Sequence, residues 1–233
     1  MGAMRTVAIL PVKRFASAKS RLGASVEDRL RERLARAMVS DVLRALAEST
    51  AIERTIVVTR EQSLREAAEQ HRALMIDDTA ELGQSAAVAL GIDRALADGA
   101  ERVLCVPGDC PALDPAELDK LIEASDAQAR RAHVVIVPDR HGTGTNGLLL
   151  APPEAIAPSF GTDSCARHER LARDAGVECT LERPSSLLLD IDTGADLAAL
   201  RDRLDGAAGG APLTRAVLAK PEQQSIKTIL TAS

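Results

Sequence analysis

Apolar segments alternate with segments of helical periodicity along almost the whole chain. Strands are predicted where three or more apolar or β-branched residues follow one another, which is typical of a sheet buried on both faces. The predicted strands are Thr6–Val12, Thr55–Thr59, Ala73–Ile76, Arg102–Val106, Val134–Val137, Leu148–Ala151, Val177–Leu181 and Leu187–Ile191. These short segments are expected to supply the strands of one sheet.

Helices are predicted between these strands. Ser25 and Asp28 have the S-x-x-D spacing of a capping box, and Asp114 stands before Pro115, a residue that favours the first helical position. Helices are expected to begin at Ser25 and Asp114, to cover Glu61–His71, Gln84–Asp98 and Asp196–Leu204, and to run from Asp163, as N-cap, to about Asp174. Strands that alternate with helices predict an α/β protein with a mostly parallel sheet.

The length of the chain and the extent of this pattern predict one domain. A chain of 233 residues has the size of a single domain, and the alternation extends over residues 4–204. Beyond Leu204 it fades through Gly206–Gly210 into polar sequence. We therefore expect one domain over residues 4–204 and a polar C-terminal tail over residues 205–233, part of it disordered.

The composition argues against several classes of function. Phe15 and Phe160 are the only Phe, Tyr or Trp residues and the formal net charge is −5, which disfavours binding to nucleic acid by stacking or by a broad basic surface. No run approaches the roughly 18 apolar residues of a membrane span, and the start of the chain lacks the features of a signal peptide. The four cysteines have no C-x-x-C spacing, so reduced buried thiols are expected rather than zinc. We expect a cytoplasmic protein that binds neither nucleic acid nor membranes.

Candidate ligand-binding residues are sought directly after the strands, because ligands of open α/β sheets bind outside the carboxyl ends of the strands. The first strand is followed by four cations within nine residues, Lys13, Arg14, Lys19 and Arg21. Cations in a loop that leads into a helix favour a polyphosphate, although a solvated basic loop has the same composition. The pattern G-x-x-x-x-G-K-[ST] does not occur, so this loop is not a P-loop.

Carboxylates follow two other predicted strands. Asp109 lies in the segment PGDCP, and Asp190 and Asp192 lie in DIDT. Carboxylates at the end of a strand suit a hard metal ion such as Mg²⁺. In an extended D-x-D the two side chains point to opposite faces, so a turn is needed to bring both to one metal. The alternative for Asp192 is that it caps the following helix.

Two later loops have features that favour an anion. The segment GTGTNG over residues 142–147 matches G-x-G-x-x-G, but the apolar run after it predicts a strand rather than the helix of a dinucleotide-binding site. Its backbone N–H and hydroxyl groups could still bind a small anion. Phe160–Ser164 leads into a helix, whose N-terminus also favours an anion, although an ordinary capped helix explains it equally well. The four histidines lack metal-ligand spacing, and only His168 is of interest, because it lies near Ser164.

Taken together, these segments resemble a known family. PVKR with AKSRL, PGDCPAL, GTGTN, FGTDSCARH and DIDT occur here in the order found in the 2-phospho-L-lactate / phosphoenolpyruvate guanylyltransferases, over roughly Arg5–Leu204. Those enzymes act in the biosynthesis of the deazaflavin coenzyme F-420. The resemblance implies a three-layer α/β/α sandwich with a mixed, mostly parallel sheet of the nucleotide-diphospho-sugar transferase (GT-A) type, and the use of GTP and Mg²⁺.

The resemblance implies roles at the nucleotide for several residues. Lys13, Lys19 and Arg21 would hold the triphosphate of GTP, and the two lysines would take part in catalysis. Gly83 and Ser85 would lie in the loop nearest the base, where the family often has an Asn that this sequence lacks.

The resemblance also implies a metal site and an acceptor site. Mg²⁺ would be held by Asp109, which is also expected to be catalytic, with Asp190 and Asp192. The phosphorylated three-carbon acid would contact Thr145, Gly161 and Ser164.

The expected reaction transfers GMP from GTP to the phosphate of phosphoenolpyruvate, with release of pyrophosphate and formation of enolpyruvyl-2-diphospho-5'-guanosine for a downstream transferase. The acceptor phosphate is already anionic at neutral pH and needs no general base, which fits the absence of Ser-His-Asp or Cys-His patterns. Alternative acceptors are 2-phospho-L-lactate and 3-phosphoglycerate. The other hypotheses are a nucleotidyltransferase for a sugar or pterin phosphate, and a non-catalytic GTP-binding domain.

Overall fold

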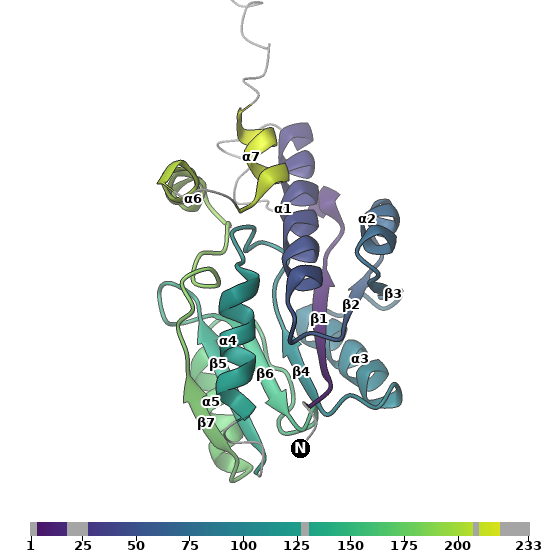
Figure 1. Ribbon diagram of the computed structural model, residues 1–233, viewed down its shortest axis with the longest axis vertical. Coiled ribbons are helices and arrows are strands. Elements are labelled where there is room, and N and C mark those ends of the chain that lie inside the picture. The colour runs from purple at the N-terminus through teal and green to yellow at the C-terminus, as the bar shows by residue number, and fades with distance from the viewer. Residues whose placement is uncertain (1–3, 18–27, 127–130, 207–209, 220–233) are drawn as a thin grey trace, which may run out of the picture.

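The structure of the protein, a computed structural model, describes residues 4–17, 28–126, 131–206 and 210–219. One sheet lies between two layers of helices (Figure 1), which confirms the predicted α/β sandwich. The strands are β1 (Thr6–Val12), β2 (Arg54–Thr59), β3 (Leu74–Ile76), β4 (Arg102–Cys105), β5 (His133–Pro138), β6 (Thr145–Ala151) and β7 (Glu178–Leu181).

The helices confirm the predicted alternation. They are η1 (Phe15–Ser17), α1 (Asp28–Glu48), η3 (Gln62–Leu64), α2 (Arg65–Gln70), α3 (Gln84–Ala97), α4 (Pro115–Asp126), α5 (Ser164–Asp174), α6 (Gly194–Gly206) and α7 (Pro212–Ala219). The predicted cap of α4 is confirmed, because the N–H of Ala116 donates to Asp114 Oδ1 at 2.9 Å. The predicted helix start at Ser25 lies outside the described residues. None of the described helices is long and apolar enough to span a membrane.

The seven strands have the order β3-β2-β1-β4-β6-β5-β7. β6 is antiparallel to its neighbours β4 and β5, whereas the other neighbouring pairs are parallel. The sheet is therefore mixed and mostly parallel, as expected. Because β6 runs in the opposite direction, its first residues lie at the edge where the other strands end.

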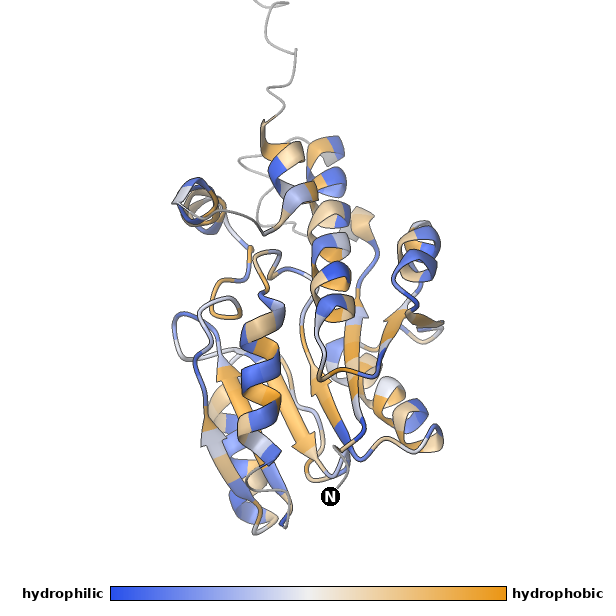
Figure 2. Ribbon diagram, viewed as in Figure 1, coloured by the Kyte–Doolittle hydropathy of each residue, from blue (hydrophilic) through white to orange (hydrophobic). Residues whose placement is uncertain are grey.

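Successive residues of the strands supply two separate cores. Ala8 and Leu10 of β1 belong to the core that α1 and α4 cover, whereas Val7 and Ile9 belong to the core that α3 and α5 cover. Figure 2 shows the central strands as almost uniformly apolar and much of α4 as hydrophilic. Burial on both faces explains why the strands read as continuous apolar runs in the sequence.

A β-bulge interrupts the pairing of β5 with β6. Val137 pairs with Gly147, but the next residue, Pro138, pairs with Thr145. Asn146 is therefore an extra residue in β6. An extra residue of this kind breaks the strict alternation of side chains along a strand.

The bulge decides where the first side chains of β6 point. Leu148 belongs to the core on the α3 and α5 side, so strict alternation would place Asn146 on that side as well. Instead, Asn146 contacts Leu187, which belongs to the core on the α1 and α4 side. Its neighbour Thr145 contacts His168 of α5. Two adjacent polar residues thus face opposite sides of the sheet.

The predicted strand at Leu187–Ile191 is wrong. The segment is a loop, although Leu187 and Ile191 are fully buried. The carbonyl oxygen of Leu187 accepts a hydrogen bond from Asn146 Nδ2, and the N–H of Ile191 donates to the carbonyl oxygen of Asp109. The segment is therefore apolar because it is a buried loop, and its backbone forms hydrogen bonds with other loops and side chains instead of with a neighbouring strand.

Part of the expected polar tail is a helix. α6 continues to Gly206, and α7 lies along α1 (Figure 1). The buried carboxylate of Asp41 in α1 accepts hydrogen bonds from the N–H groups of Leu213 and Thr214 at the start of α7. Residues 207–209 and 220–233, the rest of the expected tail, lie outside the described ranges.

The buried side chain of Arg102, the first residue of β4, joins this strand to α4. The side chain of Arg102 is 1 % exposed and forms an ion pair with Asp126 at 2.7 Å. It also donates to Thr6 Oγ1, to Ser125 Oγ and to the carbonyl oxygen of Ile122. Burial of a guanidinium is tolerated here because its charge is paired and its N–H groups have acceptors.

Candidate active site

A cavity of about 830 Å³ opens at the edge of the sheet where β1 and β4 end and β6 begins. Among the described residues predicted for the site, all except Ser85 line this cavity: Lys13, Gly83, Asp109, Thr145, Gly161, Ser164, Asp190 and Asp192. Lys19 and Arg21 lie outside the described residues. Motifs far apart in the sequence therefore meet in one place, and the roles of their residues remain predictions.

The loop that carries Lys13 is fixed by hydrogen bonds with Thr59, the last residue of β2, and with Glu61 just after it. Thr59 Oγ1 donates to the carbonyl oxygen of Val12 at 2.7 Å. The N–H of Phe15 donates to Glu61 Oε2 at 3.0 Å. Burial raises the pKa of Glu61, but hydrogen bonds from Ser63 and Phe15 more than offset this, so that the pKa lies below its usual value. Glu61 is therefore ionised near neutral pH, and its bond to the N–H of Phe15 holds the loop that carries the exposed Lys13.

The loop that carries Asp109 packs closely against α1. A Cβ atom on Gly108 would lie 2.9 Å from Val39 Cγ2, so a side chain there would push the loop away from the helix. The carbonyl oxygen of Asp109 accepts the N–H of Ile191 at 3.1 Å. This bond places Asp190 and Asp192, on either side of Ile191, next to the end of β4.

The carboxylate of Asp190 lies among other charges. Burial raises its pKa, and the negative charges of Asp109 and Asp192 raise it further, whereas a hydrogen bond from Asn146 lowers it. Asn146 Nδ2 donates to Asp190 Oδ1 at 3.1 Å and to the carbonyl oxygen of Leu187 at 2.8 Å. Carboxylates that repel one another in a cavity are the donor set that a hard divalent cation favours.

The three aspartates do not form a ready-made metal cage. Within the described ranges, no group of three or more His, Cys, Asp or Glu side chains is arranged to hold a metal ion. Asp109 and Asp190 nevertheless fit Mg²⁺ in their chemistry, because carboxylate oxygens are hard ligands and the negative charge of Asp109 helps to raise the pKa of Asp190. A magnesium site at these residues stays a prediction.

Asp192 does not cap the helix that follows it, α6, which was the alternative considered from the sequence. Asp196 Oδ2 accepts the N–H groups of Asp192 and Thr193, and Thr193 Oγ1 accepts the N–H of Asp196. Thr193 and Asp196 thus form a capping box, and the side chain of Asp192 is left to line the cavity. Arg140 pairs with Asp196 Oδ1 at 2.5 Å and ties this turn to the loop after β5.

The predicted acceptor residues line the same cavity, at or just before the start of α5 and at the start of β6. Gly161 has φ of +112°, a backbone conformation that favours glycine. Ser164 is buried, and its Oγ atom has no hydrogen-bond partner among the described residues. Asp163 occupies the N-cap position as predicted, but its side chain makes no capping bond. The start of α5 therefore leaves polar groups available to a ligand.

Ser85 acts on the site through another residue. Its Oγ atom accepts the N–H of Phe160 at 2.8 Å, so the first turn of α3 holds the loop that precedes α5. Gly83, the residue before α3, lines the cavity and has φ of +102°. The prediction that both contact the nucleotide is not tested by these contacts.

Three further residues organise the site and had no clear signal in the sequence. Asn146 lies inside the GTGTNG segment, Asp196 inside a helix, and Arg167 beside His168. Arg167 donates to the carbonyl oxygens of Ser159, Phe160 and Thr162 and so fixes the loop before α5. The T-x-x-D spacing of Thr193 and Asp196 could have identified the capping box.

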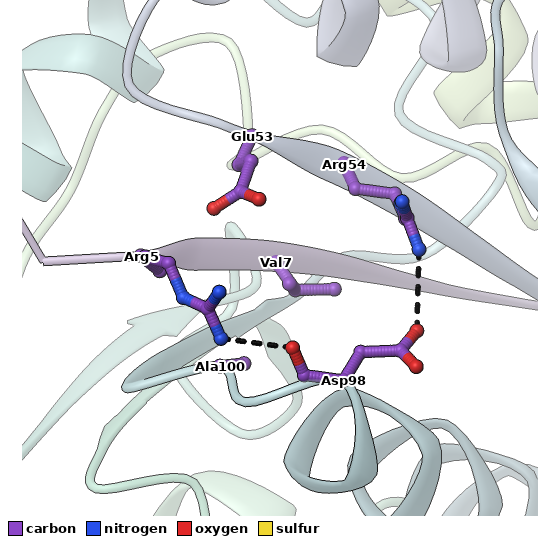
Figure 3. Close-up of a pocket in the computed structure, with 6 residues that line it drawn as sticks. All are labelled: Arg5, Val7, Glu53, Arg54, Asp98 and Ala100. Atoms are coloured by element: carbon purple, nitrogen blue, oxygen red, sulfur yellow. Dashed lines mark hydrogen bonds and ion pairs between the residues drawn. The ribbon is translucent and has the colours of Figure 1, made fainter.

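A second, smaller cavity of about 280 Å³ lies at the amino ends of β1 and β2 (Figure 3). Arg5 donates to the carbonyl oxygen of Asp98, and Arg54 pairs with the carboxylate of Asp98 at 3.2 Å. Both arginines are therefore engaged with one residue of the protein. This arrangement joins β1, β2 and the end of α3 and does not indicate a ligand site.

The sandwich, its mixed sheet and the cavity at the carboxyl edge define the nucleotide-diphospho-sugar transferase class of fold. A solved structure described as a nucleotide-diphospho-sugar transferase, from Desulfovibrio desulfuricans G20, superposes with a TM-score of 0.71 at 18 % identity. The match covers 92 % of this chain and 94 % of that one. At this level of identity, the likeness establishes the fold.

The chain belongs to the family described as "Guanylyl transferase CofC like", whose model matches residues 6–206. It is 48 % identical to the phosphoenolpyruvate guanylyltransferase of Conexibacter woesei, over 92 % of this chain and 96 % of that protein. It is 34 % identical to the 2-phospho-L-lactate guanylyltransferase of Methanothermobacter thermautotrophicus, over 83 % of each. Membership of this family makes the chain a nucleotidyltransferase, as the sequence motifs predicted.

Proposed function

We propose that the protein transfers GMP from GTP to the phosphate of phosphoenolpyruvate and releases pyrophosphate. The observation that carries this proposal is that one cavity brings together a cation, three carboxylates and two hydroxyls. The residues concerned are Lys13, Asp109, Asp190, Asp192, Thr145 and Ser164. A relative 48 % identical is named phosphoenolpyruvate guanylyltransferase, which supports this acceptor over the alternatives.

In the proposed reaction, a phosphate oxygen of phosphoenolpyruvate attacks the α-phosphorus of GTP. The bond from the α-phosphorus to the bridging oxygen breaks, and pyrophosphate leaves with the electron pair. The product is enolpyruvyl-2-diphospho-5'-guanosine. The nucleophile is an anion at neutral pH, so no side chain has to remove a proton. The tasks left to the protein are alignment of the two phosphates and stabilisation of the charge on the leaving group.

The residues predicted to hold the nucleotide would supply the charge stabilisation. Lys13 would contact the triphosphate, with Lys19 and Arg21 from the segment that follows it. Gly83 and Ser85, at the start of α3, would border the nucleotide near its base. Bound Mg²⁺, held by Asp109, Asp190 and Asp192, would neutralise phosphate charge.

The predicted acceptor residues would bind the acid. Gly161 would bring the backbone close to the ligand, Ser164 would offer a hydroxyl that has no partner among the described residues, and Thr145 would offer a second hydroxyl. Groups of this kind at a helix N-terminus favour carboxylate and phosphate oxygens. Acids that differ by one methyl, methylene or hydroxyl group are separated by only about 1–3 kcal/mol in such a site.

The test is release of pyrophosphate by the purified protein with GTP and Mg²⁺, with one acid at a time. Phosphoenolpyruvate is expected to give the highest kcat/KM, and 2-phospho-L-lactate and 3-phosphoglycerate are the comparison acids. Inclusion of the downstream transferase of coenzyme F-420 assembly would draw off the product and make slow turnover visible. Higher activity with another acid would correct the acceptor. Binding of GTP without turnover on any acid would contradict the proposed reaction.

The biological setting is part of the same proposal. The product would serve the biosynthesis of coenzyme F-420 in the cytoplasm, where its next partner is the downstream transferase. Deletion of the gene is expected to abolish coenzyme F-420 fluorescence in cell extracts. Unchanged fluorescence would contradict a role in coenzyme F-420 biosynthesis but would leave the proposed reaction standing.

A further inference from the structure

The buried imidazole of His168 connects two parts of the proposed binding site for the acid. His168 lies in α5 and is 0 % exposed. Its Nε2 atom lies 2.9 Å from the backbone nitrogen of Ser159, and its Nδ1 atom lies 3.1 Å from Thr145 Oγ1. The ring also meets the edge of Phe160, with 5.2 Å between ring centroids and 72° between the ring planes.

These contacts fix the position of the ring proton. The backbone N–H of Ser159 can only donate, so Nε2 must be the unprotonated nitrogen of the ring. The proton of the neutral imidazole then lies on Nδ1. Burial and the neighbouring charge of Arg167 lower the pKa of His168 to about 4, so the ring is neutral near pH 7.

The position of the ring proton constrains the hydroxyl of Thr145. Nδ1–H donates to Thr145 Oγ1, so the oxygen acts as acceptor in that bond. The proton of the hydroxyl needs an acceptor of its own, and no other hydrogen bond of Oγ1 occurs within the described part of the chain. Thr145 lines the cavity, so a ligand oxygen there can take this proton.

We propose that His168 is a positioning residue that makes the Thr145 hydroxyl a hydrogen-bond donor to an anionic oxygen of the acceptor acid. The contact to Ser159 extends this role, because the same ring holds the loop that leads to Gly161. The inference rests on the proposed function for the identity of the ligand, but the protonation pattern of His168 does not depend on it.

The first test needs no substrate. In protein with ¹⁵N-labelled histidine at pH 7, the nitrogen shifts and long-range couplings of His168 are expected to show the Nδ1–H tautomer. The assignment is made by comparison with the His168→Phe variant, which lacks that signal. An Nε2–H tautomer or a charged ring would overturn the proposal.

The second test separates the two substrates. His168→Phe keeps a ring in the same place but cannot donate to Thr145, so we expect KM for the acid to rise roughly tenfold while KM for GTP is unchanged. His168→Asn, whose amide nitrogen can take the place of Nδ1, is expected to recover part of the loss. An equal rise in both KM values would indicate a general structural role and contradict the proposal.

A double-mutant comparison shows whether His168 acts through Thr145. In a Thr145→Val background, His168→Phe is expected to raise KM for the acid by clearly less than in the wild type, because the hydroxyl that it orients is gone and only the contact to Ser159 is still lost. A full tenfold effect in that background would overturn the proposal. If the wild-type protein turns over none of the acids, the proposed function fails, whereas the tautomer measurement still decides the state of His168.

Discussion

Asn146 Nδ2 lies 3.1 Å from Asp190 Oδ1 and 2.8 Å from the carbonyl oxygen of Leu187. One amide group therefore holds both a carboxylate of the cavity and the loop that carries it. The contact exists because Asn146 is the extra residue of a β-bulge, which turns its side chain toward that loop.

Replacement of Asn146 tests this link. Asn146→Ala removes the hydrogen bond to Asp190, and kcat is expected to fall about tenfold, in the range typical of residues that orient metal ligands. Asn146→Asp is expected to lower kcat further, about 100-fold, because it adds a negative charge beside a carboxylate whose pKa its neighbours already raise. Steady-state kinetics over a range of Mg²⁺ concentrations would check both. Equal effects of the two variants would contradict the electrostatic explanation.

Asp109→Asn tests the proposed metal site. The change preserves size and removes one charge from the group around Asp190. We expect kcat to fall by about 10²–10³, with a higher Mg²⁺ concentration needed for half-maximal rate. Asp93→Asn, on the exposed side of α3, is the matched control and should leave both quantities unchanged. Activity of Asp109→Asn near that of the wild type would exclude a metal role for this residue.

Ser164→Ala tests the proposed binding site for the acid. The hydroxyl has no partner among the described residues, so its loss should hardly change the stability of the fold. KM for the acid is expected to rise about tenfold, and the affinity for GTP, measured by calorimetry without acid, should stay the same. If affinity for GTP fell instead, Ser164 would belong to the nucleotide site.

The ion pair of Arg102 with Asp126 predicts a large effect on stability far from the site. Asp126→Ala leaves a guanidinium that is 1 % exposed without its counter-charge, and we expect the free energy of unfolding to fall by about 2 kcal/mol. Glu48→Ala removes a partner of Arg44 that is 51 % exposed and should cost less than about 0.5 kcal/mol. Urea denaturation would compare them. Similar losses for both variants would show that burial of Arg102 carries no special cost.

His168 predicts how stability depends on pH. Its pKa is about 4 in the folded protein, because of burial and then Arg167, and about 6.5 when unfolded. The unfolded chain therefore binds more protons between these values, and the contribution of His168 is complete above pH 6.5 and lost as pH falls toward 4. From pH 7 to pH 5 the wild type should lose about 2 kcal/mol more than His168→Gln. His71→Gln, at a partly exposed position, is the control, and parallel losses in all three proteins would contradict this assignment.

Local signals in the sequence predicted most of the elements correctly. The continuous apolar run of β1 and the Asp-Pro pair before α4 are decided by neighbours within a few residues, so their meaning does not depend on the rest of the chain. The apolar run Leu187–Ile191 was wrongly predicted to be a strand, because a short buried loop and a short buried strand can have the same apolar composition. Only the partners of its backbone, Asn146 and Asp109, distinguish the two, and they lie far away in the sequence.

The residues of the cavity were predictable where a local signal marks them. Asp109 follows the end of β4, Asp190 lies in the DIDT segment and Ser164 opens α5, and all three line the cavity as expected. Asn146 holds Asp190 by a tertiary contact that no local pattern contains. Asp196 caps its own helix over three to four residues, so the T-x-x-D spacing could have identified it. α7 was missed for the same reason as Asn146, because its first turn is capped by Asp41, 172 residues earlier in the chain.

The bulge in β6 makes the length of the segment before Leu148 as important as its composition. A deletion before Thr145 that removed the bulge but kept Asn146 would pair Asn146 with Pro138 and exchange the directions of the side chains at the strand's start. The Thr145 hydroxyl would then face the side of Asp190 and the Asn146 amide would face α5, although both residues were still present. Insertions and deletions between Thr143 and Gly147 should therefore be far more damaging than conservative substitutions there, since one residue of spacing decides which face of the sheet Thr145 and Asn146 take.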